Sequence, residues 1–227
     1  FIGYDYRERA ATNVLIDSLY QNTSYPISIT PLVTSQLVKQ GFYKRERDPK
    51  QSTDFSFTRF LVPFLMNYNG WALFMDCDML CRADICELWK QRDEKYTLLC
   101  TKHNHKPTKK TKFQGEIQTS YPKKNWSSLM LMNCKKCKKL SLNYINNASG
   151  LDLHRFNWIE NEYEIGSFNS DGWNRLICNE ENTEGNNNSK LIHWTLGGPW
   201  FKDQRNMEGK FTKEWFSARE DAMKLWD

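Results

Sequence analysis

The sequence has no stretch that approaches the roughly 18 consecutive apolar residues of a membrane-spanning helix, and it has no internal repeats. Hydrophobic residues make up 39% and aromatic residues 14%, which excludes disordered, collagen-like and coiled-coil chains. The length of 227 residues suits one domain, 1–227, with a sizeable core. The chain begins with Phe1 and not with methionine, so a signal or anchor segment upstream stays an open alternative.

A regular cysteine framework is also lacking. Seven is an odd number of cysteines, which predicts mostly reduced thiols and an intracellular, cytoplasmic protein. Cys134 and Cys137 have the spacing of a zinc knuckle, but no second pair completes four ligands, so packing is the favoured interpretation. Four Asn-x-Ser/Thr sequons would matter only in a secretory lumen; they begin at Asn22, Asn125, Asn147 and Asn187.

The excess of positive charge is small, because 32 Lys and Arg stand against 27 Asp and Glu. It is concentrated in two lysine stretches, 102–112 and 135–139. Solvated surface is the simpler interpretation of both, and the alternative is a patch for anionic acceptors, phosphates or a peripheral contact with lipid head groups. The stretch 102–112 contains no aromatic residue, which argues against single-stranded nucleic acid as a partner.

Apolar periodicity predicts strands that alternate with helices, the pattern of an α/β fold. A helix is also expected to begin at Ser52 or Thr53, with an apolar face that runs from Phe57 to Tyr68 and with Pro63 kinking or splitting it. The expected strands are 1–4, 27–32, 71–75, 98–100, 128–132 and 191–193, and further helices are expected at 10–19 and 215–226.

Two carboxylates, Asp76 and Asp78, follow the apolar strand 71–75. Residues i and i+2 of an extended chain point the same way, so the two carboxylates can converge on one point. Ligands of open α/β sheets bind beyond the carboxyl ends of the strands, and a hard divalent cation relieves the repulsion between neighbouring carboxylates. We therefore interpret the pair as metal ligands. The alternative is two solvated turn residues.

His193 ends another apolar strand, and Gly197-Gly198 follow it. Neutral imidazole is a competent ligand for Mn²⁺, and glycines allow backbone N–H groups to approach a phosphate. The alternative is a hydrogen-bonded core histidine. If His193 shares an ion with the two aspartates, strands 71–75 and 191–193 are expected to be neighbours in the sheet.

Together these segments resemble GT-A-fold glycosyltransferases, most closely family 8 and its uncharacterised relatives, over most of the chain. The resemblance implies a Rossmann-like, mixed and mostly parallel central sheet flanked by helices. It also implies a metal-dependent hexosyltransferase that uses Mn²⁺ or Mg²⁺ and works with retention. The donor would be a nucleotide-diphosphate sugar, a uridine one first and a guanosine one second, and the acceptor a saccharide or glycoconjugate.

The resemblance also assigns residues. It places Gly3-Tyr4-Asp5 in the nucleotide-binding first strand and loop. Residues 52–63 resemble the helix that leads into the metal motif, and the resemblance implies that Arg59 on this helix faces the donor. A surface arginine and a structural ion pair are the alternatives for Arg59. Residues 126–133 resemble the strand that borders the sugar and acceptor sites, and Gly172-Trp173-Asn174 resembles a tryptophan-asparagine stretch of such relatives. The metal motif is Asp76-Cys77-Asp78, with His193 as the third ligand.

The sequence departs from the family pattern at two places. Gly198 stands where a phosphate-binding lysine is expected, and Lys202 is the candidate substitute. The acidic motif before the acceptor site is not evident, so Asp171 and Asp152 are the candidates for a catalytic carboxylate, with surface acids as the alternative for both. The missing lysine keeps a second function open, a non-catalytic nucleotide- or carbohydrate-binding module on the same fold.

Overall fold

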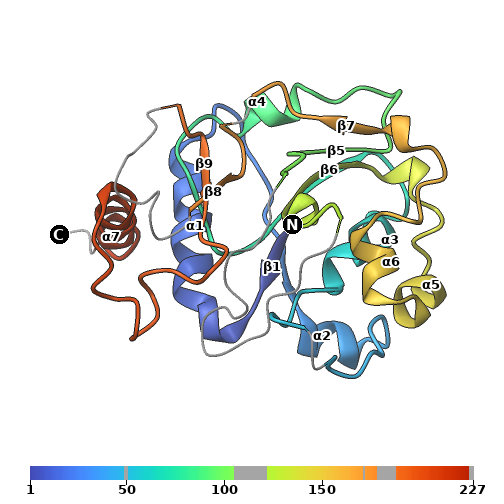
Figure 1. Cartoon of the computed structure of the whole chain (residues 1–227), viewed down its shortest axis with the longest axis horizontal. Coiled ribbons are helices and arrows are strands. Elements are labelled where there is room, and N and C mark those ends of the chain that lie inside the picture. Colours follow the sequence, from blue (N-terminus) through green and yellow to red (C-terminus); the bar gives the residue numbers. More distant parts are fainter. Residues whose placement is uncertain (49–50, 105–121, 171, 178–187, 225–227) are drawn as a thin grey trace. The chain divides into compact units, whose positions relative to one another are not determined.

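The computed structural model describes residues 1–48, 51–104, 122–170, 172–177 and 188–224 (Figure 1). The chain forms two compact units. The first unit combines Phe1–Asp5, Thr30–Asp76 and Leu88–Asn169, and the second combines Tyr6–Ile29, Cys77–Glu87 and Ser170–Asp227. Within the described ranges, no helix combines the length and the apolar character that crossing a bilayer would require.

The first unit is built on a six-stranded sheet with the order β2-β1-β3-β6-β5-β7. Pairing is parallel from β2 through β1 to β3 and again between β5 and β7, whereas β6 runs antiparallel to β3 and β5. This confirms the mixed, mostly parallel α/β sheet expected from the sequence. The strands are β1 (Ile2–Tyr4), β2 (Pro31–Val33), β3 (Trp71–Met75), β5 (Leu98–Cys100), β6 (Leu129–Asn133) and β7 (Ile165–Ser167).

The core of this unit lies at β6, where all five residues are buried. A strand with neighbours on both edges and cover on both faces has no solvent-facing side, so its sequence reads apolar almost throughout. Figure 1 shows α3, α5 and α6 gathered beside this sheet. The helices of this unit are α2 (Thr34–Lys39), α3 (Val62–Leu65), α5 (Leu142–Asn147) and α6 (Gly150–His154), and α4 (Cys86–Trp89) is divided between the two units.

The helix expected from Ser52 or Thr53 is wrong in its start. Thr53 and Ser56 form a turn in which the Ser56 hydroxyl donates to the Thr53 carbonyl over 2.9 Å. A 3₁₀ helix then covers Thr58–Leu61, and α3 follows it with Pro63 in its first turn. Hydroxyl side chains bond locally and favour turns over helix interiors, and proline is tolerated only at a helix start. The expected split at Pro63 is confirmed.

The second unit packs two long helices against a small sheet. The sheet has the order β4-β9-β8, with β4 antiparallel and β8 parallel to β9. Its apolar core contains Leu80 and Ile192 from the strands and Val14, Phe211 and Trp215 from the helices, and Figure 1 shows α1 and α7 side by side. The elements are α1 (Arg9–Gln21), α7 (Lys210–Ala222), β4 (Met79–Cys81), β8 (Arg175–Leu176) and β9 (Leu191–His193).

The expected contact between strands 71–75 and 191–193 is wrong. In the sheet, β9 pairs with β4 and β8, whereas β3 pairs with β1 and β6. β4 was not expected from the sequence. It is a three-residue strand that begins directly after the two aspartates. Because Met79 lies opposite His193 in the register of β4 and β9, the histidine is brought next to Asp78 through β4 and not through β3.

The ends of α7 also differ from the sequence expectation. The helix begins at Lys210 and ends at Ala222, earlier than the range 215–226. Trp215 is buried in the core as expected, but Met223 follows the helix and is 65% exposed. Trp226 lies outside the described residues.

The second lysine stretch pairs with acidic residues on the surface. Lys136 lies 3.7 Å from Glu164 and Lys139 lies 3.8 Å from Glu160. These pairs support the interpretation as solvated surface for residues 135–139. In the first stretch only Lys102 is described; Lys106, Lys109, Lys110 and Lys112 lie outside the described residues.

The spaced cysteines are packing residues. The thiol of Cys137 donates to the Asn133 carbonyl over 3.2 Å, and burial raises the pKa of Cys134 to about 12 and that of Cys137 still further. Both residues are fully buried. These contacts support packing as the role of Cys134 and Cys137.

Gly3→Ala is expected to destabilise the first unit by about 1–3 kcal/mol, the usual effect of overpacking a core. A Cβ atom at this position would lie 2.3 Å from the Phe55 ring, and Phe55 is fully buried. Urea unfolding followed by circular dichroism measures the loss. Adding Phe55→Leu should recover part of it, because the two positions share one contact. Simple addition of the two single effects would contradict this account.

Candidate functional site

The two aspartates follow β3, and backbone hydrogen bonds fix the chain at both of them. The Asp76 N–H donates to the Ser128 carbonyl over 2.9 Å, and the Asp78 carbonyl accepts from the Trp194 N–H over 2.9 Å. Both side chains are buried. Buried carboxylates are stable only with a counter-charge or with hydrogen-bond donors around them, so the partners of each one matter.

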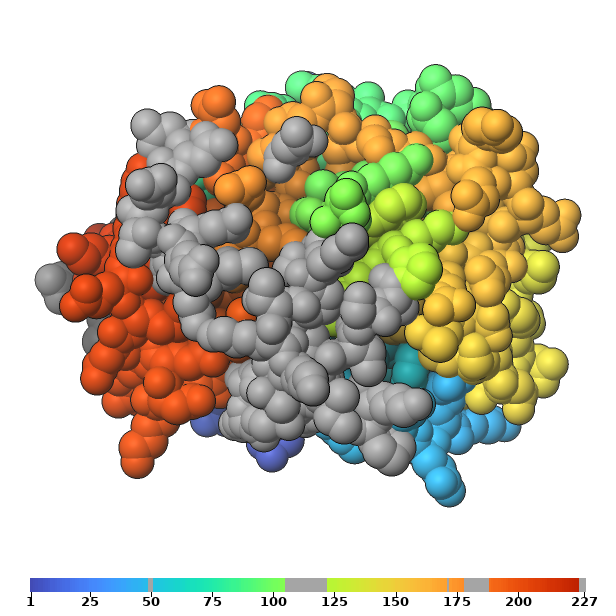
Figure 2. All heavy atoms as spheres, viewed as in Figure 1, coloured from blue at the N-terminus to red at the C-terminus, as the bar shows by residue number. Residues whose placement is uncertain are grey.

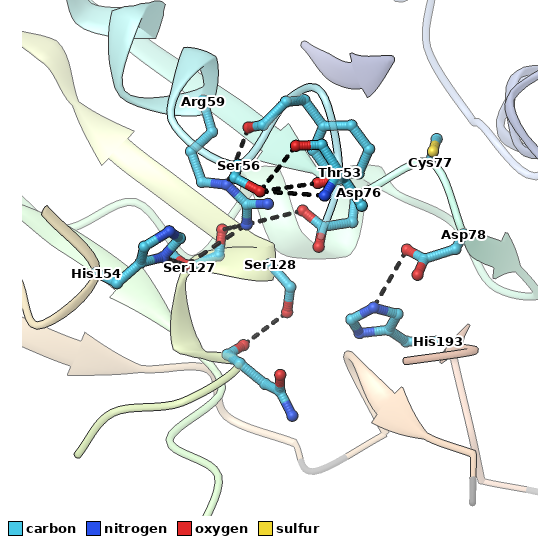
Figure 3. Close-up of polar contacts among 12 residues, drawn as sticks. Thr53, Ser56, Arg59, Asp76, Cys77, Asp78, Ser127, Ser128, His154 and His193 are labelled. Atoms are coloured by element: carbon cyan, nitrogen blue, oxygen red, sulfur yellow. Dashed lines mark hydrogen bonds and ion pairs between the residues drawn. The ribbon is translucent and has the colours of Figure 1, made fainter. Parts of the chain in front are cut away.

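Asp76 has a buried arginine as its counter-ion. The Arg59 Nη1 atom lies 2.9 Å from Asp76 Oδ1, with side-chain exposures of only 6% and 12%. Nη1 also donates to the Ser127 carbonyl over 2.8 Å, and the guanidinium lies over the rings of Phe55 and Phe74. Figure 3 shows the arginine reaching Asp76 and Ser127. The alternative of a surface arginine is therefore wrong, and the ion pair is present.

Ser127 extends this polar chain to a second histidine. Its hydroxyl lies 2.8 Å from His154 Nδ1 (Figure 3), and the imidazole packs edge-on against Phe60 with ring centroids 5.3 Å apart. No role was expected for His154 from the sequence. Its link to Ser127 joins residues 27 positions apart in the chain, which no local pattern could reveal.

His193 is oriented by two partners. Its Nδ1 atom lies 2.8 Å from Asn174 Oδ1, and its Nε2 atom lies 3.2 Å from Asp78 Oδ1. An amide oxygen only accepts, so Nδ1 carries the proton of this bond. In the neutral imidazole Nε2 then has a lone pair, and this lone pair faces Asp78. Two lone-pair atoms face each other stably when a proton or a cation lies between them. Figure 3 shows the imidazole pointing at Asp78.

The distances suit a divalent cation. Two ligands at right angles around an octahedral ion at about 2.0–2.1 Å lie about 2.8–3.0 Å apart, a little less than the 3.2 Å between His193 Nε2 and Asp78 Oδ1. One ligand atom from each of Asp76, Asp78 and His193 lies within 4.8 Å of the others, and all three residues are buried. Carboxylate oxygen and imidazole nitrogen are suitable donors for Mn²⁺. This buried group could therefore hold a divalent cation.

Cys77, between the two aspartates, is occupied elsewhere. Its thiol donates to Glu8 Oε2 over 3.2 Å, and both residues are fully buried. Successive side chains of an extended segment point in opposite directions, which agrees with a thiol turned toward the start of α1 and away from His193 (Figure 3). Glu8 was not a candidate in the sequence analysis.

The first strand and its loop hold the residues expected to bind nucleotide. Gly3 pairs with Leu32 and Tyr4 with Val33 in the parallel ladder of β1 and β2. The Asp5 carboxylate is fully buried and accepts from the Asp54 N–H over 3.1 Å. Asp5 thus fixes the loop that precedes Arg59. Whether these residues also contact a nucleotide stays a prediction.

The loop after β9 is tightly folded. Gly197 has a φ of +90° and donates from its N–H to the Trp194 carbonyl. A Cβ atom on Gly198 would lie 2.2 Å from the Trp200 ring, so packing of that ring requires a glycine here. Lys202, the candidate substitute for the missing lysine, is exposed.

Of the two candidate catalytic carboxylates, Asp152 lies within the described residues. Asp152 lies in the first turn of α6, where its carboxylate accepts from the Ser149 hydroxyl over 2.6 Å and from Asn157 over 2.7 Å. The hydrogen bond from Ser149, followed by that from Asn157, lowers the pKa of Asp152. Ser149 is the N-cap of α6 and Asp152 is the third helical residue that pairs with it, so these contacts stabilise the start of the helix. Asp171 lies outside the described residues.

Solved structures of glycosyltransferases have a fold similar to that of this chain. No family model matches the chain. It is similar to the galactosyltransferase LgtC, solved with donor and acceptor sugar analogues, at 10% identity, with a TM-score of 0.60 over 100% of this chain and 96% of that one. It is also similar to mouse xyloside xylosyltransferase 1, at 12% identity, with a TM-score of 0.51 over 86% and 96% of the two chains. These likenesses show the GT-A glycosyltransferase fold.

The sequence itself has a relative in a plant. Protein CDI of Arabidopsis thaliana is 44% identical over 231 residues, which cover 99% of this chain and 86% of that protein. Such identity over nearly the whole chain shows common family membership. The chain therefore belongs to the family of Arabidopsis Protein CDI and has the fold of GT-A glycosyltransferases.

Proposed function

We propose that this protein is a metal-dependent glycosyltransferase that moves a sugar from a nucleotide-diphosphate donor to a saccharide or glycoconjugate acceptor. The observation that carries the proposal is the buried group Asp76, Asp78 and His193, found on a GT-A fold. Asp76 already has Arg59 as its counter-ion, whereas Asp78 faces the imidazole of His193, an arrangement that is unfavourable unless a proton or a cation lies between the two groups. In a glycosyltransferase, a cation held by these residues would also stabilise the anionic diphosphate leaving group.

The same three residues would hold the metal ion, Mn²⁺ or Mg²⁺. When bound, the ion would stabilise the negative charge that develops on a diphosphate leaving group. The protein's part is to fix the ligands. Arg59 holds Asp76 through its Oδ1 atom, and Asn174 holds His193 with Nε2 facing Asp78. Each ligand thus has a partner that restricts its rotation, as expected of a site organised in advance.

We propose a uridine diphosphate sugar as the donor, with a guanosine one as the runner-up. The base and ribose would lie by Gly3-Tyr4-Asp5, and the amides of Gly197 and Gly198 would donate to phosphate oxygens. Lys202 is the candidate for a further cation, since the structure leaves it exposed. We keep retention as the proposed outcome and Asp171 as the candidate nucleophile. Asp152 is the weaker candidate, because Ser149 and Asn157 occupy its carboxylate.

A thermal-shift screen followed by a transfer assay tests this proposal. Uridine and guanosine diphosphates and their sugars are added with Mn²⁺ or Mg²⁺, and a ligand that binds only the folded state raises the melting temperature. Release of nucleotide diphosphate from a sugar donor, dependent on the metal, would support the transferase. A shift with guanosine and none with any uridine nucleotide would contradict the proposed donor.

The second candidate is a non-catalytic nucleotide- or carbohydrate-binding module. It is favoured by Gly198, which packs under Trp200 where a phosphate-binding lysine is expected. In the same experiment this module would give a thermal shift with nucleotide and metal but no release of nucleotide diphosphate from any donor sugar.

Asn174→Ala is expected to weaken metal binding by about 10–100-fold, the usual effect of removing a partner that orients a ligating histidine. Asn174 is fully buried and adopts a φ of +64°. Asn174→Asp keeps the shape of the side chain and an acceptor oxygen, and it is therefore the conservative variant to compare with Asn174→Ala. Titration of Mn²⁺ followed by electron paramagnetic resonance measures the affinity. An alanine variant that folds and binds Mn²⁺ as the parent does would show that Asn174 does not orient a ligand.

A further inference from the structure

A cavity of about 360 Å³ lies in the second unit, where α1 and α7 meet the end of β4. Asp17 and Asn22 line it from the side of α1, and Glu214 and Asp221 line it from α7. Leu80, Cys81 and Ala218 give it an apolar part. None of these residues has a role in the proposed transfer.

The positive charge in this cavity is already compensated. Arg82 Nε lies 2.5 Å from Glu214 Oε1, and Arg82 Nη1 donates to the Ser189 carbonyl. Its guanidinium also lies over the Phe211 ring, 5.4 Å from the centroid. Arg82 and Glu214 therefore neutralise each other, and the charge that the lining offers to a ligand comes from Asp17 and Asp221.

Those two carboxylates are weakly compensated. Asp17 forms no ion pair with any residue in the described part of the chain. Among the described residues, Asp221 pairs with Lys224 alone, at 3.4 Å and with both side chains more than half exposed. An exposed pair of this kind contributes little. The cavity is thus negatively charged from both helices.

The neutral side chains present acceptors as well. Both amide hydrogens of Asn22 are used, one by the Ser18 carbonyl and one by the Cys81 carbonyl, so only its Oδ1 atom is available. Ser189 is 4% exposed, and its hydroxyl has no hydrogen-bond partner among the described residues. A buried hydroxyl without a partner is unfavourable in a cavity wall. The ligand that suits this lining supplies donors.

We infer that this cavity binds a small organic ammonium ion, of the alkyl-diamine class. An ammonium group has three N–H donors and one positive charge, which match the carboxylate of Asp17 and the Oδ1 atom of Asn22. A second ammonium group would face Asp221 on α7, with the alkyl chain along Leu80 and Ala218. A metal ion is disfavoured, because the carboxylates of this cavity form no converging group of metal ligands among the described residues.

Isothermal titration with putrescine tests the inference, with butylamine and butanediol as ligands of equal chain length and lower charge. We expect affinity to fall from putrescine to butylamine and to vanish with butanediol. Asp17→Asn should weaken putrescine binding about tenfold or more, because it removes one charge-assisted contact. Glu220→Gln, on the exposed side of α7, is the matched control and should bind as the parent does.

Three results would overturn the inference: no binding of putrescine by the parent protein, equal binding of butanediol, or unchanged affinity in Asp17→Asn. Displacement of putrescine by Mg²⁺ would also overturn it, in favour of a metal site. The titration requires neither nucleotide nor a transferred sugar. Its outcome is therefore independent of the outcome of the transfer assay.

Discussion

Arg59→Ala is expected to lower the free energy of unfolding by about 3–5 kcal/mol, the usual effect of removing one partner from a buried ion pair. Arg59 is 5% exposed and lies 2.9 Å from Asp76. Without it, a buried carboxylate keeps its charge and loses its counter-ion, and the Ser127 carbonyl loses its donor. Urea unfolding of the parent and the variant, without added metal, measures the difference.

A double-mutant cycle separates the ion pair from the packing of the arginine. Adding Asp76→Asn to Arg59→Ala should restore part of the stability, because the neutral amide needs no counter-ion. Arg47→Ala is the matched control. Its pair with Asp54 has side-chain exposures of 48% and 35%, so its loss should change stability by less than about 1 kcal/mol. Equal effects of the two arginine variants would show that burial does not decide the energy of the Arg59 pair.

This expectation replaces the one that the sequence favoured for Arg59, a donor contact of little structural weight. The sequence could not show the partner, because the ion pair joins residues 17 positions apart on different elements. A role toward the donor stays a proposal. Loss of donor affinity can be interpreted only after the stability of the variant has been measured.

The strands could be predicted where the apolar pattern was strong. β3, β5 and β9 were expected with the bounds that the structure gives them, because each is a short apolar run. β4, β7 and β8 were not expected. β8 has only two residues, β7 reads Ile-Gly-Ser and lacks an apolar run, and β4 is separated from β3 by only three residues. The wrong strand pairing follows from the failure to expect β4, because β4 is the strand that pairs with β9 and places His193 beside Asp78.

The candidate metal group was predictable only in part. The spacing of Asp76 and Asp78 on an extended chain already implied that they converge. The position of His193 beside them was inferred from its place at the end of another apolar strand and from the family resemblance. Asn174 could not be assigned to His193, because the contact depends on a residue with positive φ in an irregular segment.

Asp78→Asn is expected to abolish metal-dependent transfer, with a loss of about a thousandfold or more, because a bound ion contributes several kcal/mol of charge stabilisation. The amide keeps the shape of the side chain and is a poorer ligand for a hard cation. The fold should be intact or slightly more stable without metal, since one of two neighbouring buried carboxylates loses its charge. Release of nucleotide diphosphate and the midpoint of urea unfolding measure the two effects.

Asp203→Asn is the matched control for charge, because Asp203 is exposed; it should leave both transfer and stability unchanged. His193→Ala should weaken metal binding without eliminating it, since two carboxylates remain. Comparison of the metal affinities of the two variants therefore tests how the ion is held. Loss of Asp78 should lower the metal affinity more than loss of His193 does. If Asp78→Asn transfers sugar at the parent rate, Asp78 is not a ligand. The contact of 3.2 Å with His193 would then be explained by a proton shared between carboxylate and imidazole.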